Sequence, residues 1–505
     1  MRTRAPLLLT IGLALAVPGC KAKPAQKTGE PGTPIPGMGS MPPGMGAMGG
    51  GAMGPVRTSA MRPGAAGAST GIMARKEAVG LAQKFVALLR AAKWKEAHAL
   101  YAPKIRKTFG VAKLQGVWEK LLQRFGKFER YDKGVWVLPK GDLAFVFMPS
   151  WWQKGKFDLI VPIQGNQGVA GIRLQFHEHH GEFPAPSYAD PKKFSERNVT
   201  VGEGTPWELP GTLTTPRAPV PYPVVVVVHG SGPQDRDATF GPNKAYRDLA
   251  WGLASQGIAV LRYDKRTKVH AQRMLKLKKK ITHVQEYVED ALAAVKMLHG
   301  SKDVSRIFVL GHSDGAYTVP AILKRAVGAA YGTRMGGGIL LAGPSRQLYE
   351  NYLEQILFLA KLRKVADQPE VKAHIAALKK AIQKAKDPKL SAATPNRELP
   401  MYASAEYWLA RRAYKHKQIA MALKMPLLVL NGKRDYQVTA TDFNGWTTAL
   451  KGKANAFFRM YPDLNHFFMK GQGPPNPREY YNAGHVDLRV IGDLAHFVKK
   501  QQLRK

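Results

Sequence analysis

A serine between two glycines, in the segment Gly311-His312-Ser313-Asp314-Gly315, has the residue types for nucleophilic chemistry. The apolar residues 307–310 before it predict a strand buried on both faces, and residues 316–327 predict a helix. A serine on a sharp turn between strand and helix presents its hydroxyl at the sheet edge, with the next backbone N–H aimed at the same space. Ser313 is therefore the candidate nucleophile, and an ordinary turn residue is the alternative.

An acid and a base follow this serine along the chain. Asp435 lies in the loop that leaves a predicted strand at 426–430. His466 lies in the loop that leaves the next, at 455–461. Because parallel strands end at a common sheet edge, Ser313, Asp435 and His466 are expected to meet there. His466 would take the hydroxyl proton, and Asp435 would orient the imidazole.

Four other side chains compete for these roles. Asp463 is an alternative acid, but it shares a tight loop with His466, which makes the required geometry harder. His485 is an alternative base, although it is predicted to open the final helix. Asp235 and Asp264 are predicted to brace loops by ion pairs with nearby arginines rather than to join the chemistry.

A glycine-rich segment, 229–237, follows the valine run 224–228. Glycines at a strand end let backbone N–H groups turn toward a ligand. The backbone N–H groups of Asp314 and of Ser231 or Gly232 are the candidates for holding a developing oxyanion, each worth about 3 kcal/mol. The carboxylate of Asp314 is expected to border the pocket.

Residues 194–505 alternate between predicted strands and helices, which indicates a doubly wound, mostly parallel α/β sheet opened by antiparallel strands near 199–201 and 209–213. A long helical segment, 347–423, interrupts this rhythm before the last two strands. We interpret it as a helical lid whose apolar stripes shape an acyl or alcohol pocket, with plain helical packing as the alternative.

Five segments of this region resemble one esterase branch of the α/β-hydrolase superfamily, namely 229–237, 262–266, 311–315, 430–438 and 461–466. The resemblance implies hydrolysis of a small-molecule carboxylic ester through a covalent acyl-enzyme, without metal or cofactor. Ala316 and Thr267 stand where this branch usually has glycine or a glycine-containing turn. The same three side chains also suit a peptidase or a thioesterase, and a non-catalytic surface lipoprotein on a hydrolase scaffold is the other class.

Residues 73–185 predict a separate small α+β domain, in which two amphipathic helices precede four strands. The segment resembles a small domain that precedes some α/β-hydrolases. Its cluster at 177–180 contains three histidines, but neighbouring residues of a strand point to opposite faces, so we expect a polar strand end rather than a metal site.

The N-terminus predicts export. Basic residues precede an apolar run at 6–17, and Cys20, the only cysteine, follows it. The pattern resembles a bacterial lipoprotein signal peptide at 1–20, which implies a lipidated Cys20 and anchoring at the outer membrane or cell surface; ordinary secretion with an incidental cysteine is the alternative. Residues 21–72 are rich in Gly, Pro and Met and indicate a disordered tether.

The formal charge of +40 is extreme. Its lysines are scattered over many predicted helices, and no known nucleic-acid module is present, so a specific nucleic-acid partner is not expected. Basic tracts such as 276–280 are typical of a solvated surface or of contact with an anionic lipid or polymer.

Overall fold

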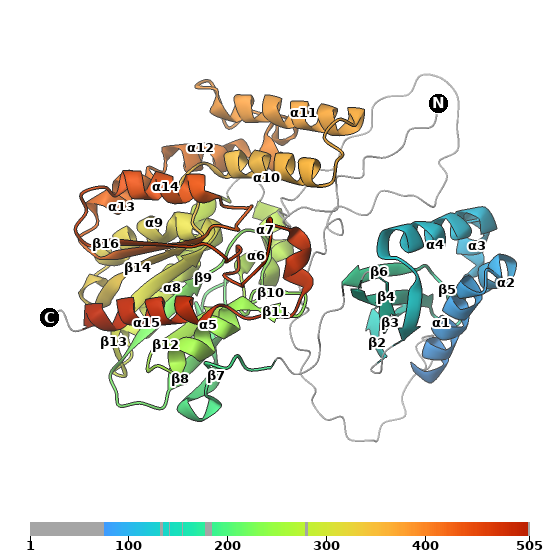
Figure 1. Ribbon diagram of the computed structural model, residues 1–505, viewed down its shortest axis with the longest axis horizontal. Coiled ribbons are helices and arrows are strands. Elements are labelled where there is room, and N and C mark those ends of the chain that lie inside the picture. The colour runs from blue at the N-terminus through green and yellow to red at the C-terminus, as the bar shows by residue number, and fades with distance from the viewer. Residues whose placement is uncertain are drawn as a thin grey trace. The chain divides into compact units, whose positions relative to one another are not determined.

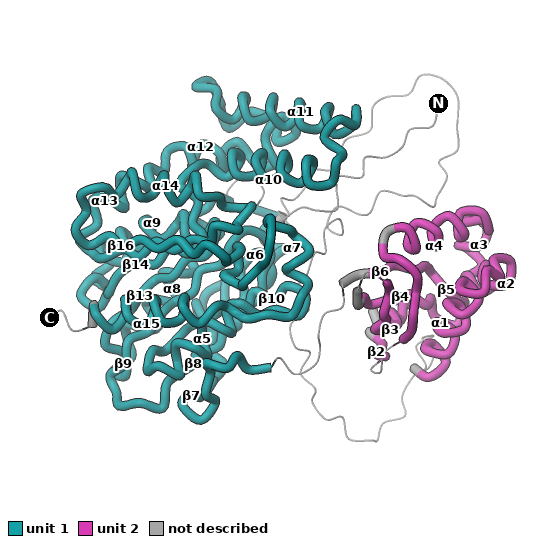
Figure 2. The backbone as a smooth tube through the Cα atoms, in the orientation of Figure 1, with its two compact units in different colours: residues 1–21, 43–52, 183–505 teal, residues 22–42, 53–182 magenta. Residues whose placement is uncertain are grey.

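The computed structural model describes residues 75–131, 135–140, 142–153, 155–176, 184–277 and 281–502. The predicted signal peptide with Cys20, the tether 21–72, the histidine cluster 177–180 and part of the basic tract 276–280 lie outside the described residues. The chain divides into two compact units, which Figure 2 colours differently. Their described residues are 75–176 and 184–502.

In the smaller unit, helices come first and strands follow, as the pattern predicts (Figure 1). Its elements are α1 (Arg75–Arg90), α2 (Trp94–Ala99), α3 (Pro103–Thr108), α4 (Val111–Phe125), β1 (Phe128–Tyr131), β2 (Trp136–Lys140), β3 (Leu143–Trp152), β4 (Gly155–Gln164), β5 (Gly168–Val169) and β6 (Arg173–Phe176). The strands form an antiparallel sheet in the order β1-β3-β4-β5, with β2 on β3 and β6 on β4. The apolar face of α1 packs through Phe85 against this sheet in one buried core.

The larger unit is built on an eight-stranded sheet in the order β16-β15-β14-β13-β9-β12-β8-β7. The strands are β7 (Phe194–Val201), β8 (Leu209–Pro216), β9 (Tyr222–Val228), β12 (Ala259–Tyr263), β13 (Val304–His312), β14 (Met335–Leu341), β15 (Leu427–Gly432) and β16 (Ala456–Tyr461). The pairs β7–β8 and β8–β12 are antiparallel, and all others are parallel. The predicted doubly wound α/β fold is confirmed.

The valine run of β9 explains why this strand lies inside the sheet. Val224, Val226 and Val228 belong to one hydrophobic core, and Val225 and Val227 belong to the other. Alternate residues of a strand point to opposite faces, so both faces must be covered for this sequence to be stable.

Helices cover both faces of the sheet (Figure 1). Helices α5 (Ala245–Ala254) and α15 (Leu488–Gln502) supply one core, whereas α8 (Glu289–His299), α9 (Asp314–Gly328) and α14 (Ala440–Ala449) contribute to the other. The helix predicted from residue 284 begins as a π-helical turn, η3 (Val284–Val288), before α8 continues it. No helix in the described part of the chain is long and apolar enough to span a bilayer.

Residues 347–423 form what we call the helical insertion, with α10 (Leu348–Leu362), α11 (Pro369–Lys386), α12 (Ala405–Ala413) and α13 (His416–Ala422). Its predicted apolar stripes pack largely on one another, because Leu348, Ile356, Leu378 and Ile382 share one buried cluster. Leu359 instead packs with aromatic residues of the main domain. Most of the apolar surface predicted to shape a pocket is therefore used inside the insertion.

Short elements complete the larger unit. They are η1 (Pro191–Lys193), β10 (Thr239–Phe240), β11 (Asn243–Lys244), α6 (Arg266–Val269), α7 (Ala271–Leu277), η4 (Gly332–Arg334), η5 (Asn396–Glu398), η6 (Pro400–Tyr402) and η7 (Pro477–Tyr481). The pair β10–β11 forms a separate two-stranded ribbon.

Candidate active site

Ser313 occupies a strained turn between β13 and α9, with φ 54° and ψ −126°. A non-glycine residue adopts such angles only where its surroundings enforce them. The glycines of the motif make the turn possible by close approach. A Cβ on Gly315 would lie 2.2 Å from the carbonyl oxygen of His229, and one on Gly311 would lie 2.5 Å from the backbone of Gly315. The motif is thus a steric requirement of this junction.

Asp435 and His466 meet at the ends of β15 and β16, as their spacing predicts. His466 Nδ1 donates to Asp435 Oδ2 at 2.6 Å. Asp435 Oδ1 accepts backbone N–H groups from Gln437 (2.7 Å) and Val438 (3.0 Å), which fixes the carboxylate. The Asp435 contact leaves Nε2 as the ring nitrogen that can accept a proton from an alcohol.

His466 also lies beside the serine turn. Its ring centroid is 4.6 Å from that of His312, the residue that precedes Ser313. Among the described residues no hydrogen bond joins Ser313 Oγ to the His466 ring, a common condition when no substrate is bound. Ser313 is buried, with 7% of its surface exposed.

The rival acid and base are engaged elsewhere. Both carboxylate oxygens of Asp463 accept from Arg489 at 2.8 Å. The His485 ring forms a hydrogen bond with Asp248 at 3.1 Å. His485 does not open the final helix as predicted, because α15 begins three residues later, at Leu488. Neither side chain contacts Ser313 or His466 among the described hydrogen bonds and ion pairs, so the geometry favours Asp435 and His466.

The glycine-rich loop after β9 runs against the serine. A Cβ on Gly230 would lie 3.1 Å from Ser313 Cβ. In the described part of the chain, the N–H groups of Ser231 and Gly232 have no protein acceptor. Asp314 is the first residue of α9, where N–H groups are free of intrahelical partners and the helix dipole favours negative charge. These three N–H groups suit the binding of an oxyanion.

Two segments of the family pattern hold each other in place. Arg236 forms a two-pronged ion pair with Asp264, with both contacts at 3.1 Å. Asp237 pairs through one contact with the buried Arg262, whose other terminal nitrogen pairs with Glu196. The predicted bracing role of Asp264 is therefore confirmed.

Asp235 braces the same loop by a different route. Its carboxylate accepts the backbone N–H groups of Asp237 and Thr239, at 2.9 and 3.0 Å. The predicted pairing of Asp235 with an arginine is thus wrong, because the side chain closes its own turn instead.

Lys265 and Thr267 fasten this loop from the other side. Lys265 Nζ is buried, donates to Gly230 O at 2.9 Å and pairs with Glu286 at 2.7 Å. Thr267 Oγ1 donates to Gly232 O at 3.2 Å. Thr267 stands where a glycine-containing turn is expected and lies in the short helix α6, which begins at Arg266, so this departure adds a contact to the loop.

Asp314 does not border a pocket, so that expectation is wrong. Its carboxylate is 1% exposed and forms a two-pronged ion pair with Arg411 of α12, at 2.8 and 3.0 Å. Burial alone raises the pKa of Asp314, but the Arg411 guanidinium outweighs burial and brings the pKa below its ordinary value. Arg411 was missed from the sequence, where nothing distinguishes it from the other arginines of the insertion.

Two histidines near the serine are neutral because they are buried. Burial and the nearby Lys265 ammonium lower the pKa of His229 to about 3. Burial also lowers the pKa of His312 to about 3, with a further contribution from His466. Both rings are therefore uncharged near neutral pH and add no positive charge to the site.

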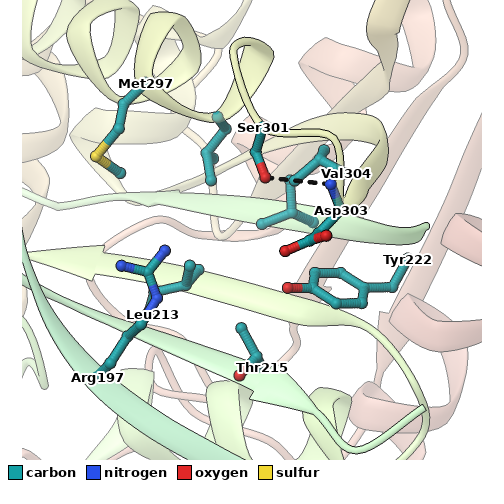
Figure 3. A pocket seen from close by; sticks show the side chains of 10 residues that line it. Arg197, Leu213, Thr215, Tyr222, Met297, Ser301, Asp303 and Val304 are labelled. Carbon is teal, nitrogen blue, oxygen red and sulfur yellow. Dashed lines mark hydrogen bonds between the residues drawn. The ribbon is translucent and has the colours of Figure 1, made fainter. Parts of the chain in front are cut away.

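Two cavities lie away from this site. One, of about 230 Å³, opens where β9 and β13 begin, at the opposite sheet edge from Ser313. Figure 3 shows the Asp303 carboxylate close to the Tyr222 hydroxyl there. The other, of about 520 Å³, lies between α10 and α11. No cluster of metal-ligating side chains occurs in the described ranges.

Comparison with known proteins follows the same lines. Residues 221–472 match the family model described as serine aminopeptidase, S33. Esterase EstD of Thermotoga maritima is 34% identical over 416 residues, which covers 82% of this chain and 94% of that protein. The 416 matched residues are more than the segment 183–505 contains, so the match extends into the smaller unit.

Solved structures also match. Est1E from Butyrivibrio proteoclasticus is 14% identical, with a TM-score of 0.37, and the match covers 61% of this chain and 99% of that one. The acylaminoacyl peptidase of Pyrococcus horikoshii is 16% identical, with a TM-score of 0.39, over 74% of this chain and 51% of that one.

Proposed function

This chain belongs to the α/β-hydrolase superfamily as a carboxylesterase-like hydrolase related to esterase EstD, and from that premise we propose that Ser313 cleaves carboxylic esters through a covalent acyl-enzyme. The observation that carries the proposal is the 2.6 Å contact between His466 and Asp435, beside a serine held in a strained turn. A serine hydroxyl is a weak nucleophile until a base removes its proton, and this arrangement supplies one.

In the first half of the reaction, His466 Nε2 accepts the proton of Ser313 as Oγ bonds to the ester carbonyl carbon. The carbonyl oxygen becomes an oxyanion held by the N–H groups of Asp314 and of Ser231 or Gly232. His466 then gives its proton to the departing alcohol, and the acyl group stays on Ser313. Asp435 stabilises the imidazolium that forms in between.

In the second half, a water molecule gives a proton to His466 and attacks the acyl carbon. The tetrahedral intermediate collapses, the bond to Ser313 Oγ breaks, and the proton returns from His466 to that oxygen. The products are the carboxylic acid and the free enzyme. The protons come from the Ser313 hydroxyl in the first half and from water in the second, and His466 carries each to its acceptor, so the two halves balance without any change of oxidation state.

The test is turnover of short-chain nitrophenyl esters by the wild type and by Ser313→Ala. We expect the substitution to lower kcat by about 10⁴-fold or more, because nucleophile and base act as a unit. Ser255→Ala is the matched control. Ser255 lies at the end of α5, and its hydroxyl accepts the backbone N–H of Asp190, so the variant removes a serine hydroxyl outside the proposed site. Full activity in Ser313→Ala would overturn the proposal.

Peptide cleavage is the second candidate, favoured by the description of the matching family as serine aminopeptidases. Esters and amides pass through the same acyl-enzyme and differ in the leaving group that His466 must protonate. Aminoacyl nitroanilides assayed beside nitrophenyl esters separate the two. We expect kcat/KM to favour esters, and a preference for anilides would replace esterase by peptidase.

We also propose that the protein is exported and anchored to a bacterial membrane through lipidated Cys20, with its basic surface in contact with anionic lipid. The signal-like pattern of residues 1–20 and the +40 charge support this. Cys20→Ser should release the protein from the membrane fraction of expressing cells. If Cys20→Ser stayed with the membrane fraction at high salt, where contact with anionic lipid is screened, the lipid anchor would be contradicted.

A further inference from the structure

A short chain of hydrogen bonds links the three loops that carry the proposed chemistry. His312 Nε2 lies 2.9 Å from the carbonyl oxygen of His466. His312 Nδ1 lies 3.1 Å from the hydroxyl of Tyr246 on α5. That hydroxyl in turn accepts the backbone N–H of Gly230 at 3.2 Å. The chain thus runs from the glycine-rich loop through the serine turn to the histidine loop.

Which atom donates and which accepts in each hydrogen bond can be worked out by starting from the His466 carbonyl. A carbonyl oxygen only accepts, so His312 Nε2 must carry the proton that it shares with His466. Burial lowers the pKa of His312 to about 3, so the ring is neutral and Nδ1 is an acceptor. The Tyr246 hydroxyl must therefore donate to Nδ1, which leaves its oxygen to accept from Gly230.

Three residues of this chain of hydrogen bonds are next to, or are themselves, residues of the proposed reaction. Gly230 precedes Ser231, and His312 precedes Ser313. The third residue is His466 itself, which takes part through its backbone carbonyl. The side chains that join them are well buried, with Tyr246 1% and His312 2% exposed, so water does not compete for these bonds. Gln234 Oε1, in the same glycine-rich loop, lies 3.5 Å from the Tyr246 oxygen, but the single hydroxyl proton goes to the nearer His312 Nδ1 at 3.1 Å.

We propose that Tyr246 and His312 are positioning residues. They hold the glycine-rich loop, the serine turn and the catalytic His466 in the relative positions that the reaction needs. This inference rests on the proposed function and adds to it. Neither side chain has a hydrogen bond to a reacting atom, although the His312 ring also packs on the His466 ring, with centroids 4.6 Å apart. Both act through backbone groups next to Ser231, Ser313 and His466. Displacement of a reacting group by about 1 Å can cost about 100-fold in rate, so loss of the chain should appear in kcat.

The experiment is a double-mutant cycle of Tyr246→Phe and His312→Phe, assayed with a nitrophenyl ester and corrected for active sites by burst titration. We expect each single variant to lower kcat about 10- to 100-fold and to change KM less than about 3-fold. Because both break one chain, the double variant should be about as slow as the slower single one. Two independent contributions would instead multiply.

Tyr461→Phe is the matched control. It also removes a buried tyrosine hydroxyl that bonds a polar side chain, Asp493 of α15, but it does not touch the chain. We expect it to lower the melting temperature without changing kcat per active site. If His312→Phe does not fold, the comparison of Tyr246→Phe with Tyr461→Phe decides alone.

A Tyr246→Phe variant with kcat within about 2-fold of the wild type would overturn the inference, and so would multiplicative losses in the cycle. Failure of the proposed function would look different. In that case Ser313→Ala itself would remain active, whatever the variants of Tyr246 and His312 do.

Discussion

Asp314 and Arg411 form a fully buried ion pair that joins the residue after the proposed nucleophile to helix α12 of the helical insertion. The guanidinium also lies 4.1 Å from the ring centroid of Tyr317 on α9 and bonds the Tyr407 hydroxyl at 3.2 Å. Two N–H···O contacts to the carboxylate, a third to a hydroxyl oxygen and the contact with an aromatic ring together define one geometry for Arg411. The helical insertion is therefore fixed to the serine turn at this point.

Arg411→Met should destabilise the protein by about 3–5 kcal/mol, because it leaves the Asp314 carboxylate buried without a partner. Urea unfolding measures this directly. Arg412→Met is the matched control, since its neighbouring guanidinium bonds only a backbone carbonyl, that of Asp387, among the described contacts. Adding Asp314→Asn to Arg411→Met should recover part of the loss, and a further loss would contradict the account.

Asp435→Asn should lower kcat by about 10⁴-fold, because an amide can donate to His466 Nδ1 and favour the wrong tautomer. KM should change little, since Asp435 lies behind the ring. Steady-state kinetics on a nitrophenyl ester measure both. Asp463→Asn breaks only the pair with Arg489 and should keep nearly full kcat. The reverse pattern would make Asp463 the catalytic acid.

Acid should destabilise the fold through its buried histidines. Burial lowers the pKa of His229 and His312 to about 3 and that of His283 and His416 to about 4. Below the unfolded value of about 6.5, the unfolded chain binds protons that the native state refuses. Stability should therefore fall as pH drops from about 6.5 to about 4, by roughly 1.4 kcal/mol per pH unit for each histidine.

His416→Gln tests this pH dependence. The variant should flatten the slope of unfolding free energy against pH over that window, whereas His496→Gln, at an exposed position, should leave it unchanged. Equilibrium urea unfolding at several pH values gives the slopes. Equal slopes in all three proteins would show that His416 is not a source of the acid sensitivity.

The sequence was sufficient for features that local pattern controls. The valines of β9 require burial on both faces, and the glycines around Ser313 are required by backbone contacts at a strand–helix junction. The chain order of Ser313, Asp435 and His466 follows from strands that end at one edge. Each of these inferences depends on residues close in sequence or on the general geometry of parallel sheets.

Long-range side-chain pairing could not be predicted. Arg411 lies 97 residues from Asp314, and the path of the helical insertion between them is not written in hydrophobic periodicity. The same periodicity does not say what a stripe packs on, so the apolar stripes of the helical insertion are predicted to shape a pocket, although those of α10 and α11 pack largely on one another. The hydrogen bonds of Tyr246 could not be predicted from the sequence, because its partners come from two other loops.

The most direct test of the central claim is covalent labelling with a fluorophosphonate, followed by mass analysis of the peptide that contains Ser313. We expect one adduct, on Ser313, that appears as esterase activity is lost and is absent from Ser313→Ala. Inactivation with the adduct on another serine, or undiminished esterase activity after Ser313 is fully labelled, would contradict it.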